Sequence, residues 1–420
     1  MRVLHVIPSI SERAGGPSQA ILPMCRALIA QGVDVTLATT DHDLPVATCE
    51  FLAATCQNGA AVRIEGNVPA ATGNEQREGN EVLSGTTTPN PNLETRNHNG
   101  IPTIFFPWQF GTSYKYSRPF AQWLNKHVAD FDLVHVHAVF NHASGAAARA
   151  CLKHGVPYVV RPLGTLDPWS MRQKSFKKKM FWWLHGKRLL SSAAVIHYTT
   201  EGEKQATEQS LGLNHGAVVP LGVDSQNLGY DAALEAPRDP YVLFLSRLHP
   251  KKAVHVLVPA FLSAAKRVRD RNWRLVIAGD GPEDYYAQVK RLIESGSGHD
   301  QIVLKGWVKG ETKRELLQQA SVFALPSYQE NFALCVVEAM SCGIPVVVSP
   351  QVNLASDIAA ATAGWISDVN VDDLTRTLTE AMLSESERLK RGKNGKALAR
   401  SFEWDQIGPK LVHMYELIHA

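Results

Sequence analysis

Cysteine is scarce in this sequence, and no two cysteines stand in a pairing motif. The six cysteines are scattered over 420 residues without a Cys-x-x-Cys pair. This excludes a disulfide-stapled secreted scaffold and a zinc-ribbon-type site. We therefore expect reduced, mostly buried thiols and a cytoplasmic protein.

Long apolar runs and an excess of one charge are also missing. No stretch reaches the ~20 apolar residues that a membrane-spanning helix requires. The N-terminal "MRVLHVIPSI" has the pattern of a strand, so we expect no leader peptide. The formal net charge is only +3, which gives no reason to expect a nucleic-acid partner. Hydrophobic residues at 45% and charged residues at 20% indicate a soluble globular protein, long enough for two domains.

Two segments far apart in the chain open in the same way. Residues 2–8 have a strand pattern and lead through a glycine-containing loop into a helical pattern at 20–32. Residues 241–248 lead in the same manner through "HPKKAV" into a helical run. Strand-type runs that alternate with helix-type runs predict doubly wound α/β domains. We predict two Rossmann-like domains in tandem and a terminal helix, at 1–217, 218–402 and 403–420.

Two segments do not fit this alternation. Residues 57–100 are rich in asparagine, glycine and proline, which favours an exposed, mobile insertion over a lid. Residues 170–190 carry seven Lys or Arg and no acidic residue, with four aromatic residues interleaved. Such a basic amphipathic helix either binds an anionic membrane surface or packs its aromatic side chains on the core. The sequence leaves both interpretations open.

A pair of glutamates frames the apolar run "NFALCVV" in the second half of the chain. Glu330 follows a strand pattern at 322–327 and so lies at the edge where open α/β sheets bind ligands. The helical pattern begins near Asn331, so the backbone N–H groups of 332–334 point toward the same ligand. Glu338 stands roughly 12 Å further along the helix axis, which suits two parts of one elongated ligand. The separation between Glu330 and Glu338 is too wide for the two catalytic carboxyl groups of a glycoside hydrolase, which lie ~5–10 Å apart. Taken singly, each glutamate is explained as well by a helix cap or a solvated surface acid.

These glutamates belong to an ordered series of landmarks. The others are Gly15 and Gly16, "LVHVH" at 133–137, "PLGVD" at 220–224, "LSRLHPKK" at 245–252, "IAGDGPE" at 277–283 and "KGWV" at 305–308. In this order, over nearly the whole chain apart from 57–100, the sequence resembles the retaining glycosyltransferases of family 4, of the bacterial polysaccharide-assembly type. The resemblance implies the GT-B fold, in which two Rossmann-like domains face a central cleft. It also implies that the terminal helix crosses back to the first domain.

The resemblance implies roles for individual residues. Glu330 would contact the hydroxyls of the donor sugar and Glu338 the nucleotide ribose, since a carboxylate accepts two hydroxyl donors at once. Arg247 and Lys252 would bind the diphosphate, where fixed cations stabilise the charge that builds on the leaving phosphate. His137 would lie near the reacting sugar carbon. The other donor-binding residues that the resemblance implies are Gly15, Gly16, Gly281, Val308, Phe332, Ala333 and Leu334.

Three positions depart from the family pattern. Alanine stands at 253 and 333 and asparagine at 331, where relatives often carry glycine. The alanine at 253 is expected to affect the shape of the loop that carries Arg247 and Lys252. Asn331 and Ala333 are expected to narrow the sugar pocket. Donor selectivity is therefore expected to depend on Asn331 and Ala333.

A metal site has to be weighed as well. His135 and His137 share one face of their strand at i and i+2. No third ligand with suitable spacing is visible in the sequence, and the cations expected at the diphosphate make a metal unnecessary. We therefore predict no metal and no cofactor.

The implied function is transfer of a sugar from a nucleoside-diphosphate sugar to a hydroxyl of a glycan or lipid-linked acceptor. The leaving phosphate is expected to take the acceptor's proton, because no residue stands out as a covalent nucleophile. A nucleotide-sugar epimerase and a non-catalytic partner subunit of the same fold remain as alternatives. We expect a cytoplasmic enzyme, peripheral on the inner face of the membrane if 170–190 docks there.

Overall fold

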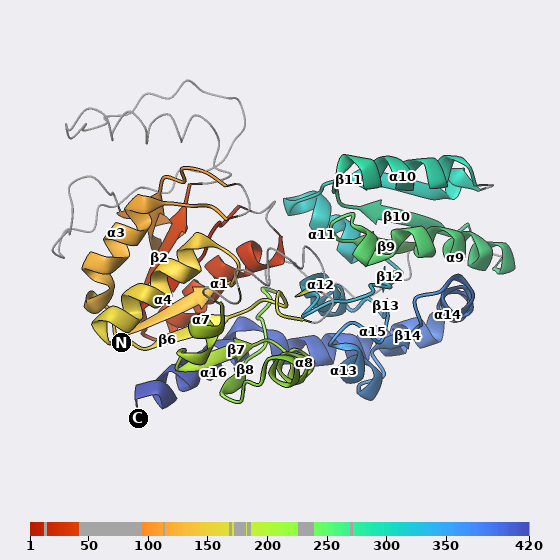
Figure 1. Cartoon of the computed structure of the whole chain (residues 1–420). Coiled ribbons are helices and arrows are strands. Elements are labelled where there is room, and N and C mark those ends of the chain that lie inside the picture. Colours follow the sequence, from red (N-terminus) through yellow and green to blue (C-terminus); the bar gives the residue numbers. More distant parts are fainter. Residues whose placement is uncertain are drawn as a thin grey trace, which may run out of the picture.

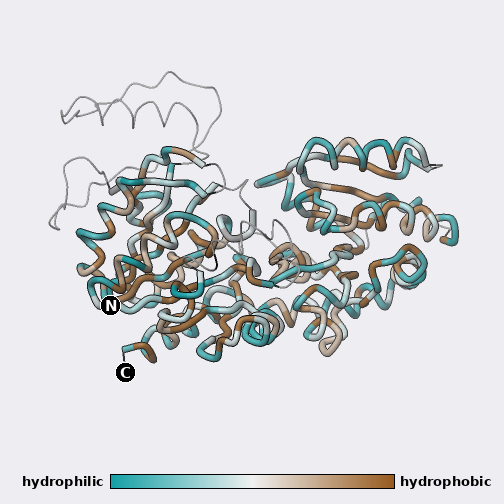
Figure 2. The backbone as a smooth tube through the Cα atoms, viewed as in Figure 1, coloured by the Kyte–Doolittle hydropathy of each residue, from teal (hydrophilic) through white to brown (hydrophobic). Residues whose placement is uncertain are grey.

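The computed structural model describes two β-sheets flanked by helices, which lie side by side in Figure 1. Hydrophobic stretches of the chain gather in the interior of each half (Figure 2). The described residues are 1–11, 15–41, 95–111, 114–167, 170–171, 182, 186–225, 239–268, 272–296 and 298–419.

The first sheet comes from the N-terminal half of the chain. Its strand order is β3-β4-β2-β1-β5-β6-β7-β8, and every neighbouring pair is parallel except β3–β4. Helices cover both faces, so the central strand β5 is buried along its whole length. The strands are β1 (Arg2–Val6), β2 (Asp34–Thr40), β3 (Thr95–His98), β4 (Ile101–Phe106), β5 (Leu133–His137), β6 (Tyr158–Arg161), β7 (Val195–Tyr198) and β8 (Gly216–Val218). The helices are α1 (Gly16–Ala30), α3 (Arg118–His127), α4 (His142–His154), α7 (Lys187–Ser191) and α8 (Glu201–Leu211).

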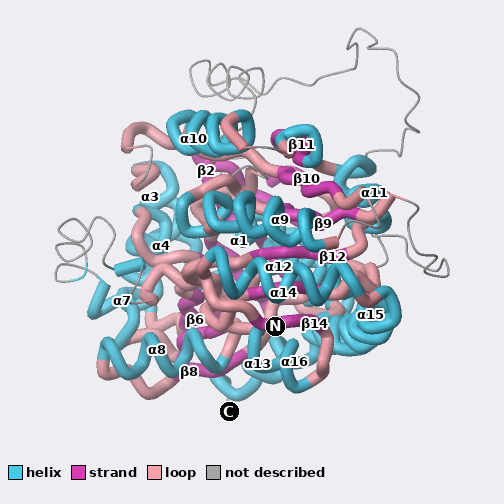
Figure 3. The backbone as a smooth tube through the Cα atoms, turned by 90° about the vertical axis from the view of Figure 1, so that its right-hand side faces the viewer, coloured by secondary structure: helices cyan, strands magenta, loops and turns pink. Residues whose placement is uncertain are grey.

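The second sheet is wholly parallel, with the order β11-β10-β9-β12-β13-β14. Figure 3 shows its strands enclosed by helices. Its strands are β9 (Tyr241–Leu245), β10 (Arg274–Ala278), β11 (Ile302–Gly306), β12 (Val322–Leu325), β13 (Val346–Val348) and β14 (Gly364–Ile366). The helices that follow are α9 (Val254–Arg267), α10 (Glu283–Glu294), α11 (Gly310–Gln319), α12 (Leu334–Ser341), α13 (Ala355–Ala360), α14 (Val371–Leu383), α15 (Glu385–Ala399) and α16 (Trp404–His419). Two doubly wound α/β domains are thus confirmed.

The predicted insertion is wrong at its C-terminal end. Residues 57–94 lie outside the described part of the chain, but residues 95–98 form strand β3, paired antiparallel with β4. This edge strand, "TRNH", has no apolar alternation that would reveal it in the sequence. Only its pairing with β4 makes it a strand.

The chain crosses between the two domains twice, and the two crossings lie against each other. Val223, which follows β8, forms an isolated parallel bridge with Glu403, just before α16. A Cβ at Gly222 would stand 2.2 Å from Cδ2 of Trp404, so glycine is needed for this contact. Helix α16 then runs back along α1, and its C-terminus ends beneath the first domain (Figure 1). Among the described helices, none has both the length and the apolarity that a membrane crossing requires.

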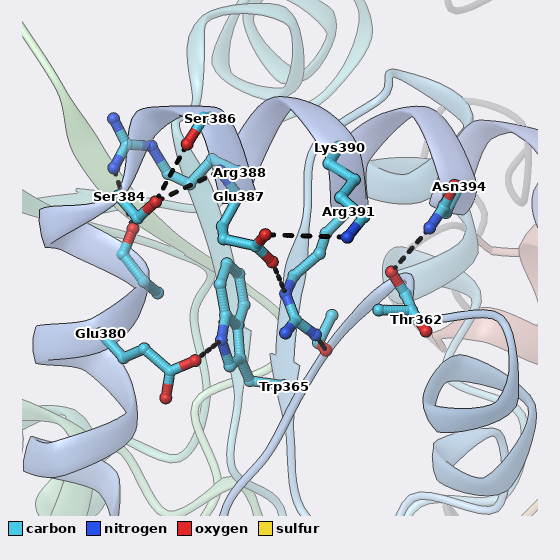
Figure 4. A network of polar contacts seen from close by, with 12 residues as sticks. Thr362, Trp365, Glu380, Ser384, Ser386, Glu387, Arg388, Lys390, Arg391 and Asn394 are labelled. Atoms are coloured by element: carbon cyan, nitrogen blue, oxygen red, sulfur yellow. Dashed lines mark hydrogen bonds and ion pairs between the residues drawn. The ribbon is translucent and has the colours of Figure 1, made fainter.

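The far end of the second domain is held by its own polar network, shown in Figure 4. The indole N–H of Trp365 donates to Glu380 at 2.8 Å, and the guanidinium of Arg391 lies 4.4 Å from the centre of the same ring. Asn394 donates from Nδ2 to the carbonyl of Thr362 at 3.2 Å. These contacts join β14 to α14 and α15 within one domain, and none of these residues lines the cavity described next.

Candidate active site

A cavity of about 290 Å³ opens between the two domains. It is lined by the α1 entry loop and the loop after β6 on one side, and by loops at the carboxyl ends of β9, β10, β11 and β12 on the other. Ligands of doubly wound sheets bind at this edge. Ten of the twelve residues predicted from the sequence line it: Gly15, Gly16, Arg247, Lys252, Val308, Glu330, Phe332, Ala333, Leu334 and Glu338.

The paired glycines bring the two domains into contact. Gly15 has φ 102°, a conformation that favours glycine, and begins α1 as its N-cap. A Cβ at this position would lie 3.5 Å from Cζ of Arg247, and one at Gly16 would lie 3.6 Å from Cδ1 of Leu334. The glycine turn therefore faces the cationic loop and the start of α12 across the cavity.

The cationic loop follows β9 and forms a single 3₁₀ turn at Pro250–Lys252. His249 caps this turn by accepting the backbone N–H of Lys251 at 3.1 Å. Burial lowers the pKa of the Lys252 ammonium to about 7, and the charges of Lys251 and Arg247 act in the same direction. Burial also lowers the pKa of Lys251 to about 8. The loop thus presents closely spaced cations whose mutual repulsion an anion would relieve.

Glu330 is fixed in place by its own backbone. Its N–H donates to the carbonyl of Gln351 at 3.0 Å, and its carbonyl accepts the N–H of Asn353 at 3.1 Å. The side chain of Glu330 forms an ion pair with Lys252. A carboxylate and an ammonium therefore meet at the cavity wall.

Helix α12 begins later than the sequence pattern predicts. The helix starts at Leu334 rather than near Asn331, because Ala333 has φ 57° and ψ 60° and breaks the helical backbone. No side chain caps this end of the helix. The N–H of Val336 donates to the carbonyl of Ala333 at 2.8 Å, which leaves the N–H of Leu334, at the start of the helix, for a ligand in the cavity. Glu338, in the second turn, accepts a hydrogen bond from Nζ of Lys313 at 2.7 Å.

His137 lies elsewhere, which corrects its predicted position beside a bound sugar. It is 1% exposed and does not line the cavity. Its Nε2 lies 3.0 Å from Nδ1 of His5, and its ring stacks on His135 at 4.3 Å between ring centres. Alternate residues of a strand share a face, so His137 points with His135 into the buried layer of the sheet instead of toward the cleft.

The expectation that no third histidine joins His135 and His137 is also wrong. Strand β1 pairs with β5 so that His5 stands opposite His135, and ligand nitrogens of His5, His135 and His137 lie within 4.8 Å of one another. Both nitrogens of His135 already have hydrogen-bonding partners, Tyr415 at 2.7 Å and His197 at 3.3 Å. The charge of Arg161 also acts on this cluster. Both features disfavour a cation among these rings.

The hydrogen bonds assign a direction to the histidine chain. Nε2 of His197 donates to the carbonyl of Val219 at 2.8 Å, so Nδ1 of His197 accepts from Nε2–H of His135. Nδ1 of His135 then accepts the hydroxyl proton of Tyr415. These hydrogen bonds link α16 to Val219, which directly follows β8 at the first interdomain crossing, and burial lowers the pKa of both His135 and His197.

Gly281 is the other predicted residue that does not line the cavity. A Cβ there would stand 1.8 Å from the carbonyl oxygen of Leu248, and one at Gly279 would stand 1.9 Å from that of Ser246. The glycines of "GDG" therefore let two backbone loops approach each other. Gly279 and Asp280 line the cavity, one step earlier in the same loop.

The sequence alone missed several lining residues. Leu163 and Gly164, in the loop after β6, form part of the first domain's share of the wall, and Lys313 comes from α11. The sequence could have indicated the loop after β6, because Leu163 and Gly164 follow a strand pattern and residues at that edge of the sheet often bind ligands. Lys313 gives no such signal, because a lysine on an amphipathic helix is usually solvated.

Two doubly wound domains facing a cleft lined with cations, carboxylates and a helix N-terminus define a protein of the GT-B class. A family model described as Glycosyl transferases group 1 matches residues 231–398, and one described as Glycosyl transferase 4-like domain matches residues 15–223. Together the two models span both domains. The chain therefore belongs to the group 1 glycosyltransferases with a glycosyl transferase 4-like N-terminal domain.

Similar proteins include two bacterial enzymes. The O-antigen chain mannosyltransferase B of Escherichia coli is 30% identical over 180 residues, which are 42% of this chain and 46% of that protein. The GDP-mannose:cellobiosyl-diphosphopolyprenol alpha-mannosyltransferase of Xanthomonas oryzae is 28% identical over 263 residues, 62% of this chain and 66% of that protein. The chain thus spans about half the length of the first of these curated relatives and about two thirds of the second.

A solved structure shows the same fold over the full chain. The Anabaena protein Alr3699/HepE, in complex with UDP and glucose, superposes with a TM-score of 0.71 at 16% identity and 99% coverage of both chains. At this identity the similarity establishes the fold alone, and it confirms the predicted GT-B architecture.

Proposed function

We propose that the protein transfers a sugar, with retention of configuration, from a nucleoside-diphosphate sugar to a hydroxyl of a glycan or lipid-linked acceptor. The observation that carries this proposal is the meeting of Arg247, Lys252, Glu330 and Glu338 at one cavity, beside the start of α12. A diphosphate requires cations and N–H donors, whereas a sugar and a ribose require acceptors for their hydroxyls. Polysaccharide synthesis is favoured because the names of both relatives refer to an O-antigen chain or a diphosphopolyprenol.

The cationic loop would stabilise the leaving diphosphate. Arg247 offers a planar fork and Lys252 a point charge, both fixed before the bond breaks. Charge builds on the phosphate only as the glycosidic bond lengthens, so these cations favour the transition state over the ground state. The diphosphate oxygen would then take the proton of the attacking hydroxyl, and the chain itself needs no covalent nucleophile.

The carboxylates and amides would hold the two ends of the donor. Glu330, with the backbone amides of Phe332, Ala333 and Leu334, would contact the sugar hydroxyls. Glu338 would contact the ribose, and Val308 would lie beside the nucleobase. Gly15 and Gly16 would let the first domain approach the donor closely, and the first domain would supply the acceptor side. His137 does not line the cavity, so we assign it a positioning role in which it stacks on and hydrogen-bonds to His5.

A nucleotide panel tests the donor class. Thermal shifts with UDP, GDP and ADP should single out one base, since a bound ligand raises Tm according to its affinity. Turnover of the matching nucleotide sugar should require a separate acceptor, which an epimerase would not need. Glu330→Ala and Arg247→Ala should each lower turnover at least ~100-fold, the size found for removing one transition-state contact. Parent-like turnover in both variants would overturn the site, and no nucleotide binding at all would overturn the function.

Peripheral association with the inner face of the membrane is a second part of the proposal. Most of 170–190 lies outside the described residues, so the support is the basic and aromatic composition of this segment and the diphosphopolyprenol in one relative's name. The parent should float with vesicles of phosphatidylglycerol and phosphatidylcholine at low salt. A variant with Lys177, Lys178 and Lys179 changed to Gln should float less. Failure of the parent to float would remove the membrane from the proposal.

A further inference from the structure

Two asparagines from the second domain reach across the cleft to two adjacent threonines of the first. Asn331 donates from Nδ2 to Oγ1 of Thr199 at 3.0 Å, and Asn353 donates from Nδ2 to Oγ1 of Thr200 at 3.1 Å. Neither threonine is more than 7% exposed, so these hydrogen bonds are largely shielded from solvent. They are direct polar contacts between the donor half and the acceptor half of the molecule.

On the second domain, the two asparagines form one rigid unit with Glu330. Asn331 follows Glu330 in the chain, and Asn353 is tied to Glu330 because its N–H donates to the Glu330 carbonyl at 3.1 Å. Nδ2 of Asn353 also lies 3.4 Å from Oδ1 of Asn331. Any shift of the asparagines relative to the threonines therefore also shifts Glu330.

On the first domain, the threonines are organised by a buried carboxylate that the reaction does not use. Glu203, 3% exposed, accepts the backbone N–H of Thr199 and its hydroxyl, each at 2.9 Å. Its other oxygen accepts the N–H of Gly164 at 2.7 Å. Gly164 lines the cavity, so one carboxylate holds both the asparagine-binding threonine and a loop of the cavity wall.

The same two loops touch directly. A Cβ at Gly164 would stand 2.9 Å from Cβ of Asn331, and Gly164 has φ 69°, so only glycine fits against this asparagine. Asn331 lines the cavity as well. The contact thus has the loop after β6 on one side and the residue next to Glu330 on the other.

We propose that Asn331 and Asn353 are positioning residues that form an interdomain latch on Thr199 and Thr200. The latch sets Glu330 against the Gly164 loop for sugar transfer and opens to exchange nucleotide. This role rests on the function proposed above. Each hydrogen bond of this kind shifts an equilibrium by ~2- to 10-fold, so both together favour the closed cleft by ~4- to 100-fold.

A disulfide would trap the latch closed. A Cβ at Gly202, in the first turn of α8, would lie 3.7 Å from Cβ of Asn353, within the ~3.5–4.5 Å range of disulfides. The oxidised Gly202→Cys/Asn353→Cys variant should exchange fluorescent mant-GDP or mant-UDP at least tenfold more slowly than its reduced form. Dithiothreitol should restore the rate. Equal rates before and after reduction would contradict the opening step.

Breaking the latch should have the opposite effect. Asn331→Ala/Asn353→Ala should increase the radius of gyration by small-angle X-ray scattering and speed mant-nucleotide release ~4- to 100-fold, the latch strength given above. The matched control is Asn394→Ala, which removes an asparagine hydrogen bond to Thr362 within the second domain alone (Figure 4). It should leave both quantities at parent values. A double variant with the parent's radius and release rate would overturn the latch.

The two proposals fail separately. If none of UDP, GDP and ADP binds the parent, the proposed function fails. The radius of gyration and the yield of the disulfide then still decide whether the latch exists. Glu203→Gln is a second variant that tests the latch. The glutamine side chain has the shape of glutamate, but one of its two acceptor oxygens is replaced by an N–H donor. It should loosen the latch without altering any residue that lines the cavity, and a parent-like radius in this variant would count against the role of Glu203.

Discussion

Lys313 Nζ lies 2.7 Å from Oε1 of Glu338, and both side chains line the cavity with about a fifth of their surface exposed. The pair joins α11 to α12, two helices that belong to successive βα units. Lys313 thereby fixes the orientation of the carboxylate proposed to bind the ribose.

Lys313→Met should weaken nucleotide binding without abolishing it. A charge-assisted hydrogen bond between partly exposed groups contributes about 1 kcal/mol, so the Kd of the preferred nucleoside diphosphate should rise about fivefold. Isothermal titration calorimetry would measure this, with Lys290→Met as the control, because the Lys290 side chain on α10 is 61% exposed. An unchanged Kd in Lys313→Met would show that Glu338 needs no support from Lys313.

Nucleotide binding should weaken as the pH rises. Burial lowers the pKa of Lys252 to about 7, so above that pH the unliganded protein holds part of this lysine neutral. A bound diphosphate favours the charged form, so binding takes up a proton, and affinity falls by up to tenfold per pH unit above about 7. Calorimetry in two buffers of different ionisation enthalpy between pH 6.5 and 8.5 would count the proton. No proton uptake, with a flat profile, would contradict the assignment of Lys252 to the diphosphate.

The sequence was sufficient for features that are local in the chain. The alternation of strand and helix patterns predicts both sheets, and the position of Glu330 after a strand places it at the ligand edge. At Ala253 and Ala333 the family resemblance leads one to expect glycine, so the sequence marked both positions as departures. The left-handed backbone that they share, with φ 54° and φ 57°, comes from the structure. Each of these inferences needs only the residue and its neighbours.

Features that depend on strand register or on the domain interface were not predictable. His5 meets His135 because β1 and β5 pair in one particular register, although 130 residues separate them. Asn331 reaches Thr199 only once both domains have folded and docked. A short edge strand such as β3 has no apolar periodicity, and the direction in which His137 points depends on the pleat of its strand.

The buried histidines should make the protein acid-sensitive. Burial lowers the pKa of His5 and His197 to about 3 and that of His135 and His137 well below the usual value. Below pH 6.5 the unfolded chain binds protons that the folded chain does not, so stability is lost as pH falls from about 6.5 toward 3. Each histidine contributes about 1.4 kcal/mol per pH unit over that window.

Urea unfolding at pH 7, 6 and 5 would measure this slope. His197→Gln should reduce the slope by about one proton relative to the parent. The control is His413→Gln, which removes a histidine of α16 whose side chain is 71% exposed. Equal slopes in the parent and His197→Gln would mean that His197 is not buried as a neutral ring.

Ala253→Gly should leave the stability of the protein within about 1 kcal/mol of the parent, because relief of backbone strain offsets the loss of a fully buried methyl group. Ala253 has φ 54° at the start of α9, where an L-residue costs about 1–2 kcal/mol. Glycine loses about 0.4–1 kcal/mol through the greater freedom of the unfolded chain and about 0.8 kcal/mol more through the lost methyl group, so the opposing contributions nearly cancel. Ala260→Gly, an equally buried alanine in the middle of the same helix, should instead destabilise by about 1 kcal/mol or more. Thermal unfolding would compare the two variants. If both lowered Tm equally, backbone strain at Ala253 would have no measurable effect on stability.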